Sequence, residues 1–170
     1  MKQIDIQYYK HNGVDMIMGS FEGKLCLLDY TYRKQRSRVD ERLKKGLKAE
    51  FIDKDNEILK RTREQLNEYF SMQRKTFDIP LHLVGSEFQK SVWNALLSIP
   101  YGQTRSYKEQ AGIVGDEKAV RAVANANGAN SIAIIVPCHR IIGSDGKLTG
   151  YAGGLALKKK LLILENNLFS

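Results

Sequence analysis

The segment IIVPCHRIIG, residues 134–143, places three polar, reactive side chains in a row between two apolar runs. Cys138 directly follows Pro137, and His139 and Arg140 come next. A cysteine attacks as the thiolate, and an ordinary thiol with a pKa of about 8.5 needs a base or a stabilising charge to reach that form. The neighbouring imidazole can act as a base near neutral pH. The segment therefore predicts a nucleophilic cysteine, with a structural cysteine as the alternative.

Other cysteine chemistries fit this segment less well. A zinc site needs further ligands, and no second Cys or His lies nearby in the sequence to supply them. A thioredoxin-like redox site needs a C-x-x-C motif, which is absent. A cysteine protease takes its histidine from a remote part of the chain. His139 is instead adjacent to Cys138, and because neighbours on an extended chain point to opposite sides, a turn or a bridging water must connect them.

A catalytic base needs a partner that orients it. Glu165 is the only acidic residue after Asp145, and it lies near the end of LALKKKLLILENN, residues 155–167, whose leucines predict a final helix with an inward face. Glu165 is therefore a candidate partner for His139, and an ordinary carboxylate on the helix surface is the alternative.

The segment just before the cysteine, SIAII from Ser131, is rich in β-branched and apolar residues and predicts a short buried strand or extended segment. Pro137 fixes its own backbone and biases Val136 towards extended geometry. We therefore expect a stiff, extended chain that presents Cys138.

Three helices are expected before this segment. Two pairs of residues have the spacing of a capping box: Ser86 with Gln89, and Ser106 with Glu109. Asp116 is the expected N-cap of a third helix that ends near Asn127. Short helices joined by a turn that contains Gly115 indicate a helix-turn-helix, and an ordinary helical hairpin is the alternative.

The third expected helix has few bulky side chains. It reads EKAVRAVANANG, residues 117–128, in which Arg121 projects from among alanines such as Ala119 and Ala122. A buried helix would carry larger apolar groups, and a solvated helix would carry more charges. Small residues suit close approach to a grooved surface, and an arginine can enter a base stack or a groove. Tight packing against another helix is the alternative.

The whole chain has 170 residues, of which 42 % are hydrophobic, and this size fits one domain or two small ones. No apolar run approaches the roughly 20 residues that a membrane helix needs, and the polar N-terminal stretch does not read as a signal peptide. The two cysteines lie far apart, which suits a reducing cytosol, and Cys26 among leucines is expected to be an inert core thiol.

The formal net charge is +8, which suggests a polyanionic partner such as nucleic acid. From Arg121 to Lys160 there are six basic residues and one acid, Asp145. The excess therefore surrounds the Cys–His–Arg sequence, and a solvated basic face is the alternative reading.

The chain is expected to divide near residue 85. Before it come strand-like pieces from Val14 and from Lys24, two charged helical segments around residues 39–47 and 56–72, and DIPLHLVG, which predicts a short strand leading into a linker. No combination of residues in this half suggests catalysis.

VPCHRII, preceded by SYKEQA and AVRAVANANGAN and followed by GYAGGLALKKKLLILE, resembles the O6-alkylguanine-DNA alkyltransferases, also called methylated-DNA–protein-cysteine methyltransferases. The resemblance covers about Gly85 to Asn166, and its order and spacing are specific. It implies an α+β protein: an RNase H-like α/β domain over residues 1–84, then a mostly helical, winged helix-turn-helix-like domain over residues 85–170. It also implies a monomer without a cofactor.

The resemblance implies irreversible, stoichiometric transfer of an alkyl group from O6-alkylguanine, and from O4-alkylthymine as a further candidate, to the protein's own cysteine. Cys138 would be the acceptor, and His139 the base that activates it through a water. Glu165 would orient the histidine. Tyr107 would bond the flipped purine and ease loss of the guanine anion.

The resemblance also implies a double-stranded DNA partner, bound through its minor groove. Arg121 would take the place of the extruded base, with Ala119 and Ala122 allowing the helix close approach. Asn130 would be a hinge between the helix-turn-helix and the cysteine loop. The base pocket would be lined by Tyr107, Ile141, Tyr151 and Ala152.

Two departures from the family affect these expectations. Many relatives have Ser where this chain has Ala152, so a hydroxyl near the lesion oxygen is missing here. Some relatives bind a structural zinc through N-terminal Cys and His residues, but Cys26 and His82 have no evident full ligand set, and we expect no zinc. The rival functions are a DNA-binding module that recognises the lesion without repairing it, which would lack the acceptor cysteine, and a cytosolic cysteine hydrolase.

Overall fold

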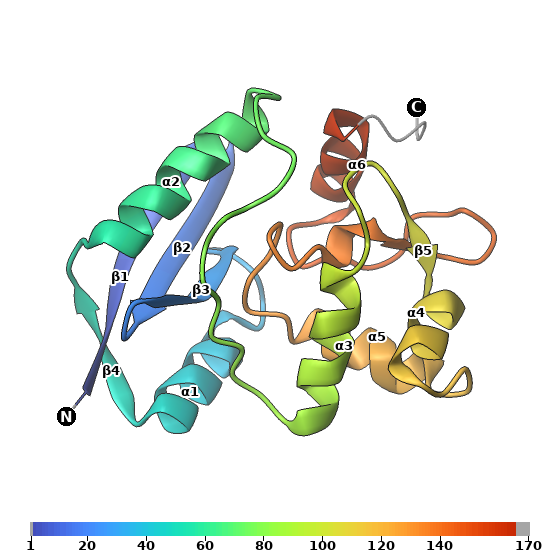
Figure 1. Cartoon of the computed structure of the whole chain (residues 1–170), viewed down its shortest axis with the longest axis horizontal. Coiled ribbons are helices and arrows are strands. Elements are labelled where there is room, and N and C mark those ends of the chain that lie inside the picture. Colours follow the sequence, from blue (N-terminus) through green and yellow to red (C-terminus); the bar gives the residue numbers. More distant parts are fainter. Residues whose placement is uncertain (1, 166–170) are drawn as a thin grey trace. The chain divides into compact units, whose positions relative to one another are not determined.

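The computed structural model describes residues 2–165 and contains two compact units, one ending at Gly85 and the other beginning at Ser86 (Figure 1). The last five residues of the second expected domain, 166–170, lie outside the described residues. Between residues 2 and 165, no helix has the length and apolar character needed to cross a membrane.

The first unit is built on a four-stranded sheet in the order β3-β2-β1-β4. Its strands are β1 (Lys2–His11), β2 (Val14–Phe21), β3 (Lys24–Tyr30) and β4 (Ala49–Asp53). The first three strands are antiparallel neighbours, and β4 runs parallel to β1. The β1–β2 connection is Asn12–Gly13, both with positive φ, which is the turn chemistry that a two-residue hairpin requires.

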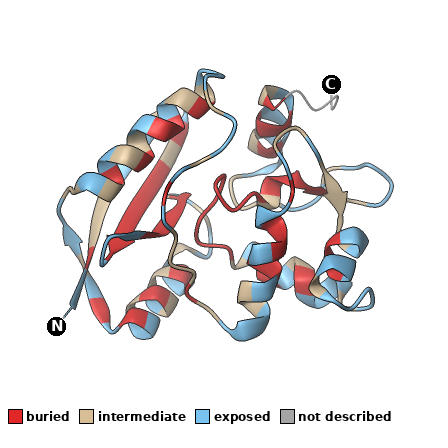
Figure 2. Cartoon of the chain, in the orientation of Figure 1, coloured by how far each residue is buried: buried red, intermediate tan, exposed pale blue. Residues whose placement is uncertain are grey.

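Two helices, α1 (Arg36–Leu47) and α2 (Glu57–Phe70), cover opposite faces of this sheet. Ile4 of β1 belongs to the apolar cluster that includes the buried face of α1. Tyr9 has the opposite parity along β1, and its hydroxyl donates to Asn67 Oδ1 of α2 over 2.7 Å. Figure 2 shows that β2 and β3 are the strands buried between these helices, whereas β1 is mostly intermediate or exposed. Cys26 is fully buried, and burial raises the pKa of its thiol to about 12, as expected for an inert core thiol.

The expected strand in DIPLHLVG does not form. Leu81 makes only an isolated bridge to Leu25, through bonds from Leu25 N to Pro80 O and from His82 N to Leu25 O. The proline removes one donor from this segment, and its apolar residues pack without continuing a ladder.

The second unit is mostly helical. It contains α3 (Glu87–Leu97), β5 (Arg105–Ser106), α4 (Tyr107–Val114), α5 (Val120–Gly128), a 3₁₀ turn (Cys138–Arg140), β6 (Ile141–Ile142) and α6 (Leu155–Leu164). Both expected capping boxes are confirmed, at the starts of α3 and α4. Strands β5 and β6 pair in parallel, so the start of α4 lies next to the residues that follow Cys138.

Side-chain hydrogen bonds hold α3, α4 and α5 together. The indole nitrogen of Trp93 donates to Ala126 O over 2.8 Å, and it joins α3 to α5. Gln110 and Asn127 exchange two amide hydrogen bonds of 2.7 Å each, which join α4 to α5. These bonds fix the end of α5 from which the chain continues towards Cys138.

The expected N-cap of α5 is wrong. The helix begins after Ala119, which makes no side-chain cap, while Asp116 Oδ1 accepts from Lys118 N inside the preceding turn. Asp116 therefore stabilises the turn that follows Gly115, whose φ of 117° ends α4. The short side chain of Asp116 accepts a hydrogen bond from the backbone two residues later in the chain, and this turn pattern competes with helix capping.

Candidate active site and nucleic-acid interface

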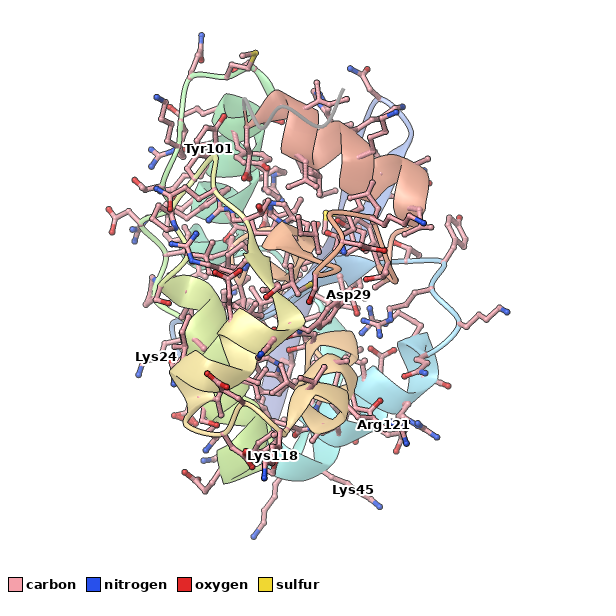
Figure 3. The ribbon with its side chains drawn as sticks, turned by 90° about the vertical axis from the view of Figure 1, so that its right-hand side faces the viewer. Lys24, Asp29, Lys45, Tyr101, Lys118 and Arg121 are labelled. Atoms are coloured by element: carbon pink, nitrogen blue, oxygen red, sulfur yellow. The ribbon has the colours of Figure 1, made fainter. Side chains whose placement is uncertain are left out.

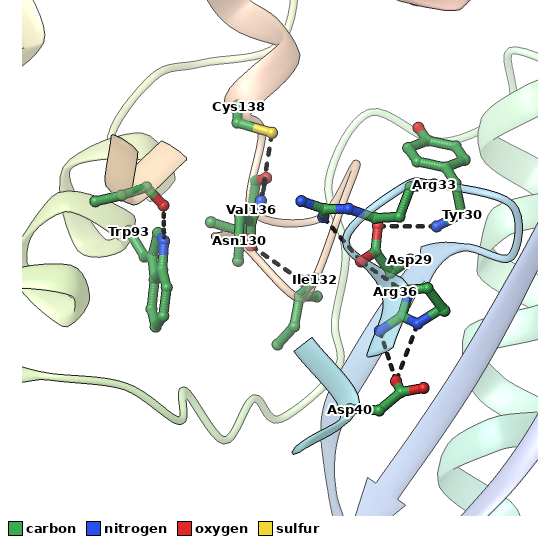
Figure 4. Close-up of polar contacts among 11 residues, drawn as sticks. Asp29, Tyr30, Arg33, Arg36, Asp40, Trp93, Asn130, Ile132, Val136 and Cys138 are labelled. Atoms are coloured by element: carbon green, nitrogen blue, oxygen red, sulfur yellow. Dashed lines mark hydrogen bonds and ion pairs between the residues drawn. The ribbon is translucent and has the colours of Figure 1, made fainter. Parts of the chain in front are cut away.

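Asn130 holds the loop that carries the cysteine. Its amide nitrogen donates to Val136 O over 2.9 Å and lies 3.4 Å from Cys138 Sγ, and its amide oxygen accepts from Ile132 N over 2.9 Å (Figure 4). One side chain thus spans the loop from its beginning to its reactive end. This arrangement is a contact between a residue just after α5 and the cysteine, and the hinge role of Asn130 stays a prediction.

The segment SIAII is buried, but apart from a single β-bridge residue at Ile132 it is a bend and turns and not a strand. Ile134 has a φ of 70°, in the left-handed region that costs a β-branched residue about 1–3 kcal/mol. The bonds from Asn130 and the bond from Val136 N to Ile132 O hold this conformation. The expected extended chain is therefore wrong, because the β-branched residues here serve burial and not pairing in a sheet.

Cys138 is the only residue from Ser131 to Ile141 that is not buried. It begins a 3₁₀ turn, and its backbone nitrogen donates to Val136 O over 2.9 Å. The tight turn leaves Cys138 partly accessible while its neighbours in the loop are buried. A nucleophile needs this combination of access and rigid support.

His139, Arg140 and Glu165 form a buried network behind the cysteine. His139 Nε2 lies 2.8 Å from Glu165 Oε2. Arg140 Nε donates to Glu165 Oε1 over 2.8 Å, a second guanidinium nitrogen donates to Oε2 over 3.1 Å, and a third donates to Ile99 O over 2.7 Å. Glu165 follows the last residue of α6 and is buried. The alternative from the sequence, an ordinary carboxylate on the helix surface, is therefore wrong.

The charges of this network set its protonation state. Burial lowers the pKa of His139 against the opposing effect of Glu165. Burial alone would raise the pKa of Glu165, but the hydrogen bonds and charges of His139 and Arg140 hold it well below its usual range. An ionised Glu165 only accepts, so a neutral His139 carries its proton on Nε2. Its Nδ1 lone pair is then available as a base, and Nδ1 is buried with no hydrogen-bond partner among the residues that the structure describes.

Tyr107 is the first residue of α4 and is half-buried. The pairing of β5 with β6 brings it to the loop after Cys138, where Thr149 Oγ1 donates to its hydroxyl over 3.0 Å. Within residues 2–165, Tyr107 makes no hydrogen bond to Cys138, His139 or Glu165. Its hydroxyl is therefore separate from the charge network.

The remaining expected pocket residues follow the cysteine. Ile141 is fully buried in β6, and Ala152 is half-buried in the loop before α6. The ring of Tyr151 meets that of His139 edge-on, with centroids 6.4 Å apart. Tyr151 thus packs edge-on against the imidazole.

Helix α5 has one buried and one exposed face. Val123 and Ala126 are buried against α3 and α4, whereas Arg121 and Ala122 are exposed and Ala119 is half-buried. Figure 3 shows Arg121 on this helix with its side chain directed outward. The exposed residues of this helix are Val120, Arg121, Ala122, Asn125 and Gly128. Arg121 is the one charged side chain among them, and a grooved, negatively charged surface can approach it closely.

Three functional candidates in this unit had no predicted role. Arg140 pairs with Glu165, Lys158 is fully buried, and Thr149 bonds Tyr107. Lys158 is one of three consecutive lysines in α6, and only the helical period, which places it on the side of Leu161 and Leu162, distinguishes it in sequence. Nothing in the sequence indicates the contact of Thr149.

Comparisons with known proteins identify the family of the chain. Residues 87–167 match the family model of the 6-O-methylguanine DNA methyltransferase DNA-binding domain. A methylated-DNA–protein-cysteine methyltransferase of Methanosarcina barkeri is 46 % identical over 91 % of this chain and 92 % of its own length. One of Mycobacterium leprae is 48 % identical over 88 % and 82 %, respectively.

Solved structures give the same result over both units. The structure of Mycobacterium tuberculosis OGT in complex with DNA has a TM-score of 0.81 and 39 % identity, and the match covers 95 % of this chain and 92 % of that one. The O6-methylguanine-DNA methyltransferase of Pyrococcus kodakaraensis, at 19 % identity and a TM-score of 0.52, shares the mixed α+β fold. The chain therefore belongs to the methylated-DNA–protein-cysteine methyltransferase family.

Proposed function

We propose that the protein performs direct-reversal DNA repair by transferring an alkyl group, such as methyl, from O6 of guanine in DNA to Sγ of Cys138. The observation that carries the proposal is the single accessible residue of a buried loop, followed at once by a buried His–Glu pair. Family membership supplies the reaction class, since the relatives are named for transfer to a protein cysteine. The chain has that cysteine, in contrast to a module that only recognises lesions.

The chemistry assigns one role to each side chain. His139 Nδ1 takes the thiol proton through a bridging water, and Glu165 stabilises the imidazolium that forms. The thiolate of Cys138 attacks the alkyl carbon, so a carbon–sulfur bond forms as the bond to O6 breaks. Guanine leaves with the electron pair, and the hydroxyl of Tyr107 stabilises that developing charge by donating to the base. The product is a thioether, and no residue of the site is suited to cleave it.

The lesion lies inside a base stack, so the nucleotide must be extruded at a cost of about a few kcal/mol. We infer that α4 and α5 act as a winged helix-turn-helix-like module on double-stranded DNA, with α5 in the minor groove. Arg121 fills the space that the extruded base leaves, and Ala119 and Ala122 permit close approach. Support comes from the exposure of Arg121 and Ala122 on a helix whose opposite side buries Val123 and Ala126.

Further assignments follow from the same proposal. The extruded base lies among Tyr107, Ile141, Tyr151 and Ala152, and Asn130 couples α5 to the cysteine loop. Ala152 offers no hydroxyl to the lesion oxygen, so recognition relies on the backbone there, and O4-alkylthymine is the second candidate substrate. The first unit is assigned an RNase H-like fold and a structural role, and the protein acts as a cytoplasmic monomer without a cofactor.

Stoichiometry tests the proposal. Excess O6-methylguanine duplex should give a burst equal to the amount of active protein and no later turnover. Trypsin releases AVANANGANSIAIIVPCHR, residues 122–140, whose only cysteine is Cys138. This peptide should gain the mass of one methylene group, and the peptide that contains Cys26 should not change.

Cys138→Ala is the matched variant and should keep lesion-DNA binding while it loses transfer. Cys26→Ala, at the only other thiol, should transfer normally if it folds. Sustained turnover would instead indicate a hydrolase, and an unchanged lesion with intact binding would indicate a recognition module.

A further inference from the structure

Lys158 of α6 is a fully buried lysine without a carboxylate partner in the part of the chain that the structure describes. Its ammonium donates to Thr149 O over 2.6 Å and lies 3.4 Å from Gly150 O. Burial lowers its pKa to about 8, and the negative charge of Cys138 opposes this shift. A buried ammonium is destabilising unless its N–H groups make hydrogen bonds, and the two carbonyl oxygens offset part of that cost.

The loop that Lys158 contacts, residues 143–154, is supported unevenly. Its first part is closed by its own backbone, with bonds of 2.9 Å from Gly143 N to Lys147 O and from Gly146 N to Gly143 O. From Leu148 to Gly150, within the described chain, no backbone group bonds to another backbone group. Lys158 therefore provides the hydrogen bonds that hold this second part of the loop.

The second part of the loop in turn holds Tyr107. Thr149 Oγ1 lies 3.0 Å from the Tyr107 hydroxyl, which has no other hydrogen-bond partner between residues 2 and 165. A tyrosine hydroxyl that accepts from Thr149 keeps its own hydrogen for a different acceptor. The contact therefore fixes both the position of the hydroxyl and the direction in which it donates.

We propose that Lys158 and Thr149 are positioning residues for Tyr107: Lys158 fixes the backbone of Thr149, and the Thr149 hydroxyl orients the Tyr107 hydroxyl towards the departing guanine. The proposal rests on the proposed function for its effect on transfer. The contacts from the Lys158 ammonium to the carbonyl oxygens of Thr149 and Gly150, which we call the clamp, do not depend on that function and can be measured without DNA.

Thr149→Val keeps the shape of the side chain and removes the hydroxyl. Single-turnover transfer from an O6-methylguanine duplex should slow by about threefold to tenfold, the range of one lost hydrogen bond. Thr149→Ser should restore the rate. In a Tyr107→Phe background, the same valine substitution should change the rate by less than about twofold, because the hydroxyl through which Thr149 acts is gone.

An equal loss from Thr149→Val in both backgrounds would overturn the role of Thr149 while leaving the alkyl transfer of the unsubstituted protein intact. Absence of a burst in the unsubstituted protein would instead contradict the proposed function. The two failures are thus distinguishable.

Backbone NMR relaxation of the free protein tests the clamp. Lys158→Met should lower the order parameters of the amides at residues 148–151 from about 0.85 to about 0.6 or less, while Lys159→Met, its exposed neighbour on α6, should leave them unchanged. If Lys158→Met does not fold, Lys158→Arg, which keeps the charge but changes the donor geometry, should lower the same order parameters. Unchanged order parameters in a folded Lys158 variant would overturn the proposal.

Discussion

At the scale of single residues, the protonation of His139 and Glu165 makes the free energy of unfolding depend on pH. The pKa of His139 lies below its ordinary value of 6.5, and that of Glu165 lies below its ordinary value of 4.5. At a pH between the pKa of each group in the folded chain and its pKa in the unfolded chain, the unfolded chain binds more protons. Acid therefore favours unfolding. Their stabilisation is complete above pH 6.5; the His139 contribution decreases as the pH falls below 6.5, and that of Glu165 decreases below 4.5.

Glu165→Gln should lower the free energy of unfolding by about 3 kcal/mol at pH 7.5, because it leaves the guanidinium of Arg140 buried without its charge partner. The difference from the unsubstituted protein should shrink as the pH falls below 4.5. Urea unfolding at pH 7.5 and pH 4 measures both effects. Glu87→Gln is the control, since that carboxylate is 95 % exposed and should change little. Equal stability of Glu165→Gln and the unsubstituted protein at pH 7.5 would contradict the ionised network.

The sequence indicated which candidate site residues lie together better than it indicated their burial. Cys138 and His139 are adjacent, so their proximity follows from the chain itself, and Glu165 was a candidate because it is the only acid after Asp145. The burial of Glu165 and Lys158 depends on packing against loops distant in sequence, which a helical pattern does not specify. These two residues therefore needed the three-dimensional structure.

At the scale of elements, α5 is expected to be needed for repair of a lesion in a duplex but not for the transfer reaction itself. Arg121→Ala should reduce transfer from duplex O6-methylguanine by about tenfold or more, because only a duplex requires the vacated stack to be filled. Transfer from the free modified base should change little. Lys118→Ala, which removes another exposed cation just before α5, is the control for lost charge. Equal loss on duplex and free base would show that Arg121 acts elsewhere.

The sequence predicted an element well where residues close together in the chain determine its conformation. The capping boxes at Ser86 and Ser106 are confirmed because both partners lie within one turn of the helix. DIPLHLVG was predicted as a strand and SIAII as a short strand or extended segment, but strand formation depends on a pairing partner elsewhere in the chain. In SIAII, Asn130 provides the hydrogen bonds instead, and the positive φ of Ile134 is incompatible with a strand.

At the scale of the whole molecule, binding to DNA should depend on salt through a small number of phosphate contacts. Of the six cations from Arg121 to Lys160, Arg140 and Lys158 are buried, which leaves four exposed. Releasing counterions at about four phosphates gives a slope near −3.6 in a plot of log affinity against log salt. Affinity for an undamaged duplex should therefore fall by about a hundredfold between 50 and 200 mM salt. Fluorescence anisotropy measures this slope, and a slope near zero would exclude the exposed cations as phosphate ligands.

The bond between Trp93 and Ala126 also gives the molecule a built-in optical probe. Trp93 is the chain's single tryptophan, and its buried indole joins α3 to α5 in the second unit. Tryptophan emission therefore reports the DNA-binding unit alone, while far-ultraviolet circular dichroism reports the helices and strands of both. Where the two units unfold independently, emission should show one transition and circular dichroism two, and adding DNA should shift the emission transition and the matching dichroism transition but not the other one.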